Sequence, residues 1–150
     1  MITASAQPFD ALSPASAYAA WRLRQSVFVV EQECAYPDLD GRDLEPGTRH
    51  VLLEEESADG PLLIGYARVL DDLSVWRIGR VVLAPSARGR GLGEALMETA
   101  LAVCPGRDVV LAAQTPLREW YAALGFVPDG EEFLEDAIPH LPMRRVSPPR

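Results

Sequence analysis

The clearest chemical signal in the sequence is a glycine- and arginine-rich segment between an apolar run and an amphipathic stretch. The apolar run covers residues 75–83, and the amphipathic stretch begins near Leu92. Between them, Arg88, Gly91 and Gly93 form an Arg-x-x-Gly-x-Gly pattern. Glycines let backbone N–H groups turn toward a ligand, and a helix N-terminus carries about half a positive charge. The segment therefore predicts an anion site suited to a phosphate or pyrophosphate.

Two other phosphate-binding motifs do not fit this segment. A P-loop requires a Gly-Lys-Ser/Thr triplet, and the segment holds no lysine. A dinucleotide fingerprint that starts at Gly89 and Gly91 would need a glycine where Glu94 stands. The side chains of Arg88 and Arg90 can add contacts to an anion held by the backbone. The alternative is a glycine-rich turn without a ligand.

The elements that position this segment follow from breaker residues and hydrophobic periodicity. Ser13-Pro14 has the capping chemistry of a helix start, and we expect that helix to run to about Phe28. Strands are expected over residues 50–56, 62–70 and 75–83, joined by turn sequences into an antiparallel meander. Acidic residues crowd the irregular stretch 31–46, which is either a solvated loop or a border of the substrate site.

The pattern changes after the glycine-rich segment. Apolar residues from Leu92 to Val103 have the spacing of an amphipathic helix, and a strand over residues 109–113 follows it. A strand–helix–strand unit implies parallel pairing through a right-handed crossover. Another helix is expected from Thr115 to Leu124, then one strand formed by residues 126–127 and residues near 133, and a last strand over residues 140–146. Pro139 and Pro142 are expected to keep the last strand short or at a sheet edge.

Length and composition set the class of protein. The chain has 150 residues, a net charge of -8 and 48% hydrophobic residues, which fits one domain over residues 1–150 with a real core. We expect frayed ends at residues 1–6 and 147–150. The fold class is a mixed α/β sheet of about six to seven strands with helices on both faces.

Charge and residue usage exclude several functions. An acidic chain argues against nucleic-acid binding, which needs clustered lysine and arginine. No apolar run approaches the ~20 residues of a membrane span, and the first residues lack a signal-peptide pattern, so we expect a cytoplasmic protein. Two cysteines, Cys34 and Cys104, and two histidines show no metal-ligand spacing, so no metal is expected. The sequence leaves the oligomeric state open, with a homodimer among the alternatives.

At this point the sequence resembles the GNAT N-acetyltransferase superfamily. The segment 88–93 is similar to that family's coenzyme A pyrophosphate loop, and Tyr121 with Gly125-Phe126 is similar to its Tyr-x-x-x-Gly-Phe helix end. A narrower resemblance is to the ElaA-like subgroup. It rests on residues 27–32, 34–41, 78–81, 113–114 and 135–140, and Ala137 departs from it where the subgroup usually has glycine.

The resemblance implies an acyl-CoA N-acyltransferase fold and acetyl-CoA as the acyl donor. The backbone of Val81, Val82 and Leu83 would pair with the pantetheine arm, and a sheet that splays after Leu83 would leave those groups in need of partners. The coenzyme set that we expect is Val81, Val82, Leu83, Arg88, Gly89, Arg90, Gly91, Leu92, Gly93, Glu94 and Gln114.

Tyr121 is the predicted general acid. Acyl transfer from a thioester expels a thiolate, and a phenol can donate a hydrogen bond or a proton to that sulfur. The alternative role of Tyr121 is a core tyrosine packed at a helix end.

The general base is open between Glu31 and His140. The amine acceptor must lose a proton, and an imidazole changes charge near neutral pH. Strands 75–83 and 109–113 carry no carboxylate, so neither supplies an acidic base. Arg80 either lines the acceptor cleft or pairs with an acid such as Asp40, because a charge facing the core needs a partner. Arg80 and Glu31 are therefore the candidates for acceptor binding.

The predicted activity is transfer of an acetyl group from acetyl-CoA to a primary amine by direct attack in a ternary complex. The acceptor is a small molecule or a peptide of unknown identity. The main alternative is a non-catalytic acyl-CoA-binding regulatory module on the same fold, because fold does not fix function. An unrelated nucleotide-phosphate-binding domain is a third alternative, which predicts that ATP competes with acetyl-CoA.

Overall fold

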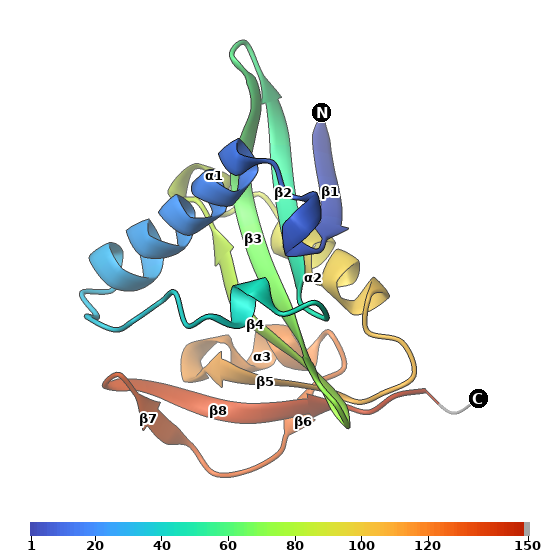
Figure 1. The fold of residues 1–150 in the computed structure, drawn as a ribbon. Helices are drawn as coiled ribbons and strands as arrows, with labels where there is room; N and C mark the ends of the chain where they lie inside the picture. Colours follow the sequence, from blue (N-terminus) through green and yellow to red (C-terminus); the bar gives the residue numbers. More distant parts are fainter. Residues whose placement is uncertain (149–150) are drawn as a thin grey trace.

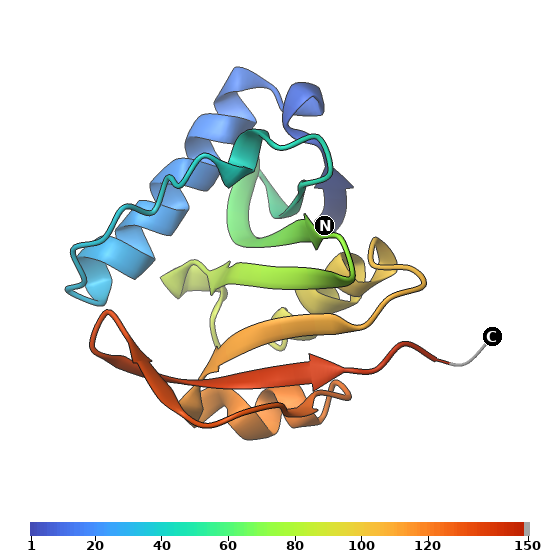
Figure 2. The same ribbon diagram turned by 60° about the horizontal axis from the view of Figure 1, so that its bottom comes forward.

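The computed structural model describes residues 1–148, in which eight strands form one mixed sheet (Figures 1 and 2). The sheet order is β1-β2-β3-β4-β5-β8-β6, and β7 pairs with β8. The strands are β1 (Ile2–Gln7), β2 (Arg49–Ser57), β3 (Gly60–Asp72), β4 (Val75–Leu83), β5 (Val109–Gln114), β6 (Val127–Pro128), β7 (Phe133–Glu135) and β8 (Ile138–Arg145).

Helices cover both faces of this sheet, as the sequence predicted. They are α1 (Pro14–Arg24), α2 (Gly93–Ala102) and α3 (Arg118–Ala122), and a π-helical segment, η2 (Gln25–Glu31), continues α1. The start of α1 has the expected cap, because Ser13 Oγ accepts a hydrogen bond of 3.1 Å from the backbone N–H of Ser16. Among residues 1–148, no helix is long and apolar enough to cross a membrane.

Two apolar clusters, one on each face of the sheet, hold the layers together. Under α1, the buried residues Ala20, Leu52 and Tyr66 pack together. On the opposite face, α2 buries Leu96 and Met97 among side chains of the sheet. Successive residues of β2 alternate between the two clusters, as the period of a strand requires. Each fully buried aliphatic side chain contributes roughly 1.5–3 kcal/mol to stability, so these layers are firmly fixed.

The meander and the crossover that the sequence predicted are both confirmed. β2, β3 and β4 pair antiparallel in succession, and β4 then pairs parallel with β5 across α2. The parallel pairing has only two registers, Trp76 with Val109 and Arg77 with Val110. Beyond Arg77 the two strands diverge (Figure 2), so the sheet opens earlier than Leu83, where the sequence placed the opening.

A bulge in β4 accompanies this divergence. Tyr66 pairs with Val82 but Arg68 pairs with Gly79, so Arg80 and Val81 together oppose a single residue of β3. Arg80 has φ of 52°, a left-handed conformation that is uncommon for a residue with a side chain. Bulges bend a strand and redirect its side chains. Here the bulge breaks the alternation that the sequence analysis assumed for Arg80 and Val81.

Three expectations about the ends and strands need correction. The first end is not frayed, because β1 pairs antiparallel with β2 from Ile2 to Gln7. At the other end, the backbone N–H of Ser147 donates to Asp108 Oδ1 at 2.8 Å, and residues 149–150 lie outside the described residues. The strand count exceeds the expected six to seven, because β1 is a strand and the region 126–135 holds two strands.

β8 is neither short nor at an edge, despite its two prolines. It is eight residues long and lies between β5 on one side and β6 and β7 on the other. Pro142 accepts a hydrogen bond of 2.8 Å from Asp129 N, which places its backbone polar groups on the side away from β5. On that side Pro142 falls between the pairing of β7, which ends at His140, and that of β6, which begins at Met143. The missing N–H therefore costs no bond to β5.

A strained two-residue turn joins β7 to β8, and replacing Ala137 by glycine should stabilise the protein. Asp136 and Ala137 have φ of 50° and 65°, the mirror-image turn that favours glycine. Relief of the left-handed strain, roughly 1–2 kcal/mol, exceeds the added entropy of the unfolded chain. We expect Ala137→Gly to raise the free energy of unfolding by about 0.5–1 kcal/mol in urea titrations.

The matched control for this prediction is Ala58→Gly, in the exposed turn between β2 and β3. Ala58 does not have a positive φ, so glycine there adds entropy to the unfolded chain without relieving strain. A loss of stability in both variants would contradict the assignment of strain to Ala137.

Candidate active site

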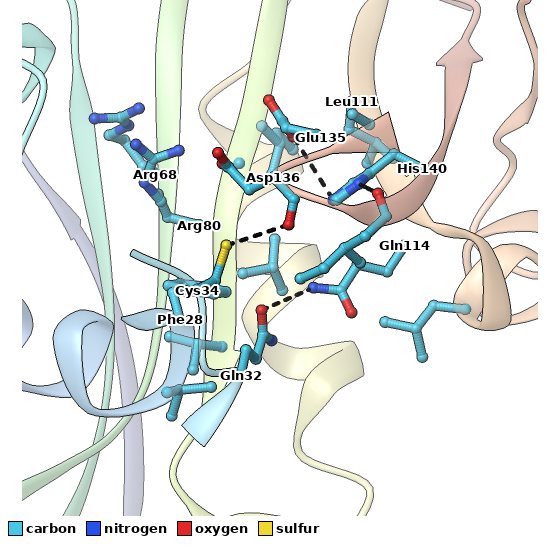
Figure 3. A pocket seen from close by; sticks show the side chains of 18 of the residues that line it. Phe28, Gln32, Cys34, Arg68, Arg80, Leu111, Gln114, Glu135, Asp136 and His140 are labelled. Atoms are coloured by element: carbon cyan, nitrogen blue, oxygen red, sulfur yellow. Dashed lines mark hydrogen bonds and ion pairs between the residues drawn. The ribbon is translucent and has the colours of Figure 1, made fainter. Parts of the chain in front are cut away.

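The opening between β4 and β5 forms a cavity of about 510 Å³ (Figure 3). Its walls come from η2, β3, β4, β5, β8 and the turn between β7 and β8. Some of the residues for which the sequence predicted chemistry line this cavity, whereas residues 89–94 of the glycine-rich loop are not among its lining residues. Those that line the cavity are Glu31, Arg80, Val81, Val82, Leu83, Arg88, Gln114, Tyr121 and His140.

The glycine-rich loop leaves a row of free backbone donors beside this cavity. Within residues 1–148, no backbone N–H between Gly89 and Ala95 donates a hydrogen bond outside its own element. The N-cap residue of α2, Leu92, supplies no side-chain cap. Gly89 and Gly91 adopt φ of 74° and 72°, which turn the chain without steric cost. The loop and the helix N-terminus together fit an anion.

Gly93 is required for a different reason, which is close packing. A Cβ at this position would lie 2.8 Å from Cζ2 of Trp120, a contact too short for real atoms. The start of α2 thus packs directly on α3, which fixes the free amides relative to Tyr121. Glu94 is exposed in the first turn of α2, where a carboxylate suits the helix dipole.

The two arginines of the loop are each paired with a carboxylate. Arg88 Nη2 lies 2.9 Å from Glu31 Oε2, and Arg90 pairs with Glu55. Arg88 and Glu31 are both more than two-fifths exposed, and exposed ion pairs contribute only about 0–1 kcal/mol. An incoming phosphate therefore competes with a weak partner for either guanidinium.

Tyr121 lies at the wall of the cavity with its ring buried. The ring packs edge-to-face on Trp120 and Phe126, with centroids 4.9 and 6.0 Å away. Burial raises the pKa of Tyr121 to about 12, so the hydroxyl keeps its proton at neutral pH. That hydroxyl makes no hydrogen bond to residues 1–148. A protonated donor without a protein partner is available to a ligand.

His140 presents one ring nitrogen to the cavity. Its Nδ1 lies 2.8 Å from the carbonyl oxygen of Ile138, which only accepts, so Nδ1 carries a proton. Nε2 then has the free lone pair of the neutral ring, and it lies 3.6 Å from Glu135 Oε2. Phe133 stacks on the ring at a centroid distance of 5.9 Å. The ring is fixed in one orientation, with Nε2 free to take up a proton.

The segment that follows α1 crosses the cavity and contacts three other elements. Besides the ion pair of Glu31 with Arg88, Gln114 Nε2 donates to Gln32 Oε1 at 3.4 Å. Cys34 Sγ donates to the carbonyl of Asp136 at 3.4 Å, and burial raises the pKa of this thiol. π-helical turns are rare and occur mainly at functional sites. η2 thus brings Glu31 to the side of the cavity lined by Arg88.

Comparison with known proteins agrees with this geometry. Residues 24–147 match the model of the acetyltransferase (GNAT) domain. The chain belongs to the GNAT acetyltransferase family. It is 42% identical to protein ElaA of Escherichia coli over 141 residues, which cover 89% of this chain and 90% of ElaA.

Solved GNAT structures give the same result. The crystal structure of an acyl-CoA N-acyltransferase from Pseudomonas aeruginosa has a TM-score of 0.89 and 38% identity, covering 97% of this chain and all of that one (100%). The structure of Escherichia coli ElaA has a TM-score of 0.87 and 39% identity, covering 95% and 99%. The resemblance to the ElaA-like subgroup and the GNAT fold are therefore confirmed, and acyl transfer is the chemistry of the family.

This GNAT chain also contains a buried charge network that the sequence analysis missed. Arg24 is fully buried, and it bonds Asp38 Oδ2 at 2.9 Å and Asp43 Oδ1 at 2.7 Å. Arg68 holds Asp40 with two nitrogens at 2.8 and 2.9 Å. The acidic stretch that looked like a solvated loop is thus anchored to the sheet.

Arg80 completes the network, and its predicted pairing with Asp40 is confirmed. Its Nε lies 2.9 Å from Asp38 Oδ1 as an ion pair without hydrogen-bond geometry, and Nη2 lies 3.4 Å from Asp40 Oδ2. The guanidinium also lies over the ring of Tyr36, 5.5 Å from its centroid. Arg80 therefore pairs with Asp40 and lines the cavity at the same time.

A neutral histidine, His50, contacts the buried end of this network. Burial lowers the pKa of His50, whose Nε2 lies 2.9 Å from the carbonyl oxygen of Asp43. Nε2 must be the donor, so Nδ1 accepts from the Tyr66 hydroxyl at 2.6 Å. No periodic pattern signals these partners. The only sequence signal is the acidic spacing of Asp38, Asp40 and Asp43 beside isolated arginines in apolar elements.

Loss of this network at low pH should be visible in the stability of the protein. Burial raises the pKa of Asp40, but bonds from Arg68 and from the backbone N–H of Arg42 outweigh burial and lower it to about 2. An unfolded aspartate has a pKa of about 3.9. The carboxylate therefore stabilises the fold above about pH 4, and that contribution is lost as the pH falls from about 4 toward 2.

We expect Asp40→Asn to lower the free energy of unfolding by about 1 kcal/mol at pH 7, because solvent screens the ion pairs of this partly exposed carboxylate, and to flatten its decline below pH 4. Urea unfolding measured at several pH values tests this. Asp59→Asn, in an exposed turn, is the control and should follow the parent curve. Parallel curves for Asp40→Asn and the parent protein would refute the assignment.

Proposed function

We propose that this GNAT protein transfers an acetyl group from acetyl-CoA to a primary amine by direct attack in a ternary complex. The observation that carries the proposal is the row of free amides at residues 89–95, which directly follows Arg88 of the cavity lining, together with the open edge of β4 inside that cavity. A diphosphate at the loop and an extended arm along residues 81–83 would satisfy both sets of backbone groups.

The donor side of the cavity is assigned accordingly. The amides from Arg88 to Gly93 hold the pyrophosphate, and Arg88 and Arg90 exchange their carboxylate partners for phosphate oxygens. The backbone of Val81 to Leu83 pairs with the pantetheine arm. Gln114, which makes only a 3.4 Å hydrogen bond to Gln32, contacts the arm from β5.

The reaction needs three groups at the thioester. The amine nitrogen forms a bond to the carbonyl carbon, and a backbone N–H near Val82 stabilises the oxyanion. The carbon–sulfur bond then breaks, and Tyr121 donates its proton or a hydrogen bond to the leaving thiolate. No covalent enzyme intermediate is required, because positioning supplies much of the acceleration.

His140 is our choice for the base that takes the proton of the ammonium. Its Nε2 is the free acceptor, and Glu135 stands 3.6 Å away to stabilise the imidazolium that forms. Glu31 is less suited, because it is paired with Arg88 on the donor side. The alternative, a non-catalytic acyl-CoA-binding module, leaves the free hydroxyl of Tyr121 without a use.

Calorimetric titration tests the coenzyme site. We expect micromolar binding of acetyl-CoA and no binding of ATP, because the loop and the strand edge together read the whole coenzyme. Gly91→Ala should weaken acetyl-CoA binding about tenfold, since a side chain at φ of 72° strains the loop by roughly 1–2 kcal/mol.

Gly106→Ala is the matched control for Gly91→Ala. Gly106 has φ of 73° and, like Gly91, open space where a Cβ would stand, but it lies in the turn between α2 and β5, outside the glycine-rich loop. The Gly106→Ala variant should lose about as much stability as Gly91→Ala but keep the parent's affinity for acetyl-CoA. Absence of acetyl-CoA binding in a folded sample would overturn the coenzyme site and leave the loop a structural turn.

Substitution of Tyr121 by phenylalanine separates catalysis from binding. We expect Tyr121→Phe to lower kcat on the order of 10²-fold with an unchanged Kd for acetyl-CoA, because only the donor to sulfur is lost. Release of free thiol in an amine screen gives the rate. Tyr18→Phe, on the exposed face of α1, is the control.

Two outcomes would count against this role. An unchanged kcat in Tyr121→Phe would make Tyr121 a packing residue. Failure of the parent protein to turn over any amine, although it binds acetyl-CoA, would favour the regulatory module.

A further inference from the structure

The acceptor half of the cavity has walls of opposite charge. Arg68 and Arg80 line it from β3 and β4, and Glu135 and Asp136 line it from the turn between β7 and β8. Figure 3 shows the two arginines on one side and the two acids with His140 on the other. The other charged lining residues are already paired, Arg88 with Glu31 and Arg77 with Asp72.

The cationic wall consists of Arg68 and Arg80, whose acidic partners lie on the side away from the cavity. Asp38, Asp40 and Asp43 bind these arginines but are not among the residues that line the cavity. Arg68 is 3% exposed, and its Nε has no hydrogen-bond partner among residues 1–148. A buried donor without a partner costs roughly 1–3 kcal/mol, so this nitrogen favours a ligand that accepts.

The acidic wall has the opposite chemistry. The Asp136 carboxylate makes no hydrogen bond or ion pair with residues 1–148, and the strained turn holds it at the cavity. Glu135 lies 3.6 Å from the proton-accepting nitrogen of His140. An ammonium that enters here is attracted by two carboxylates and lies beside a group that can remove its proton.

We propose that the acceptor is a free amino acid, whose carboxylate binds Arg80 and the Nε of Arg68 and whose amine faces Glu135, Asp136 and His140. This rests on the proposed acetyltransferase function and names its substrate class. Arginine nitrogens form a planar set of donors that matches a carboxylate. An amine that lacks the carboxylate leaves the Arg68 nitrogen unpaired in a buried site, and such sites discriminate strongly against it.

The test compares acids with their amides. The twenty L-amino acids and the corresponding amino acid amides are assayed with acetyl-CoA by release of free thiol. We expect at least one amino acid to exceed its amide tenfold or more in kcat/KM. Because the amide keeps the amine and the side chain, the comparison isolates the carboxylate.

Substitution of Arg80 tests whether the carboxylate of the amino acid binds at the arginine wall. Arg80→Gln should raise KM for the preferred amino acid at least tenfold while KM for the amide changes less than twofold. Arg80→Lys, which keeps the positive charge, should give a KM for the amino acid between those of the parent and of Arg80→Gln. An intermediate value would show that the effect of Arg80→Gln does not come from loss of folding. Arg144→Gln, on an arginine outside the cavity lining, is the control and should match the parent. Asp136→Asn should raise KM for acid and amide alike, since both carry the amine.

The outcomes separate the two proposals. Equal rates for acids and amides, or faster turnover of polyamines, would overturn the amino acid class while acetyl transfer stands. Equal rates would also indicate that water satisfies the Arg68 nitrogen. Binding of acetyl-CoA without turnover of any amine would overturn both. A tenfold preference for an acid that Arg80→Gln does not diminish would remove Arg80 from the site.

Discussion

The pairing of three arginines with three aspartates, centred on the buried Arg24, Arg68, Asp38 and Asp43, is the constraint on which the rest of the site depends. Desolvated charges destabilise a fold unless each one has a partner, so Arg24, which is fully buried, needs both Asp38 and Asp43. Residues 32–48 contain only one short 3-10 turn and few apolar anchors, yet this segment forms one side of the acceptor half of the cavity. The equal numbers of opposite charges let it dock on the sheet without burying net charge, and that docking places Gln32, Cys34 and Tyr36 in the cavity lining.

The bulge in β4 connects this network to the donor half. By placing two residues of β4 opposite one of β3, it turns Arg80 toward the aspartates and moves the end of β4 away from β5. One local irregularity therefore supplies both an arginine of the acceptor wall and the unpaired strand edge of the donor wall. The positive φ of Arg80 costs free energy, and its ion pairs with Asp38 and Asp40 offset that cost.

Much of this architecture could be predicted from local sequence, and the exceptions have a common cause. The meander, the crossover helix and the glycine-rich loop follow from periodicity and turn chemistry, which act over a few residues. The network does not, because Arg24 and Asp38 are 14 residues apart and Arg68 and Asp40 are 28 apart. The same holds for Arg88, whose partner Glu31 is 57 residues away. β1 and the interior place of β8 depend on which strand lies alongside, and composition carries no such information.

The charge of the chain has a different meaning once these pairs are known. A net charge of -8 first suggested that the acidic stretch attracts an amine, but arginines pair with three of its aspartates, of which Asp38 and Asp43 are buried. The carboxylates that remain unneutralised at the cavity are those of Glu135 and Asp136, and they stand next to His140. In the proposed reaction, attraction of an ammonium and removal of its proton therefore fall at one place, where Glu135 and Asp136 lie beside His140 of β8. Among the described residues that line the cavity, His140 carries the only imidazole, and it lies beside these carboxylates, which is why we propose His140 and not Glu31 as the base.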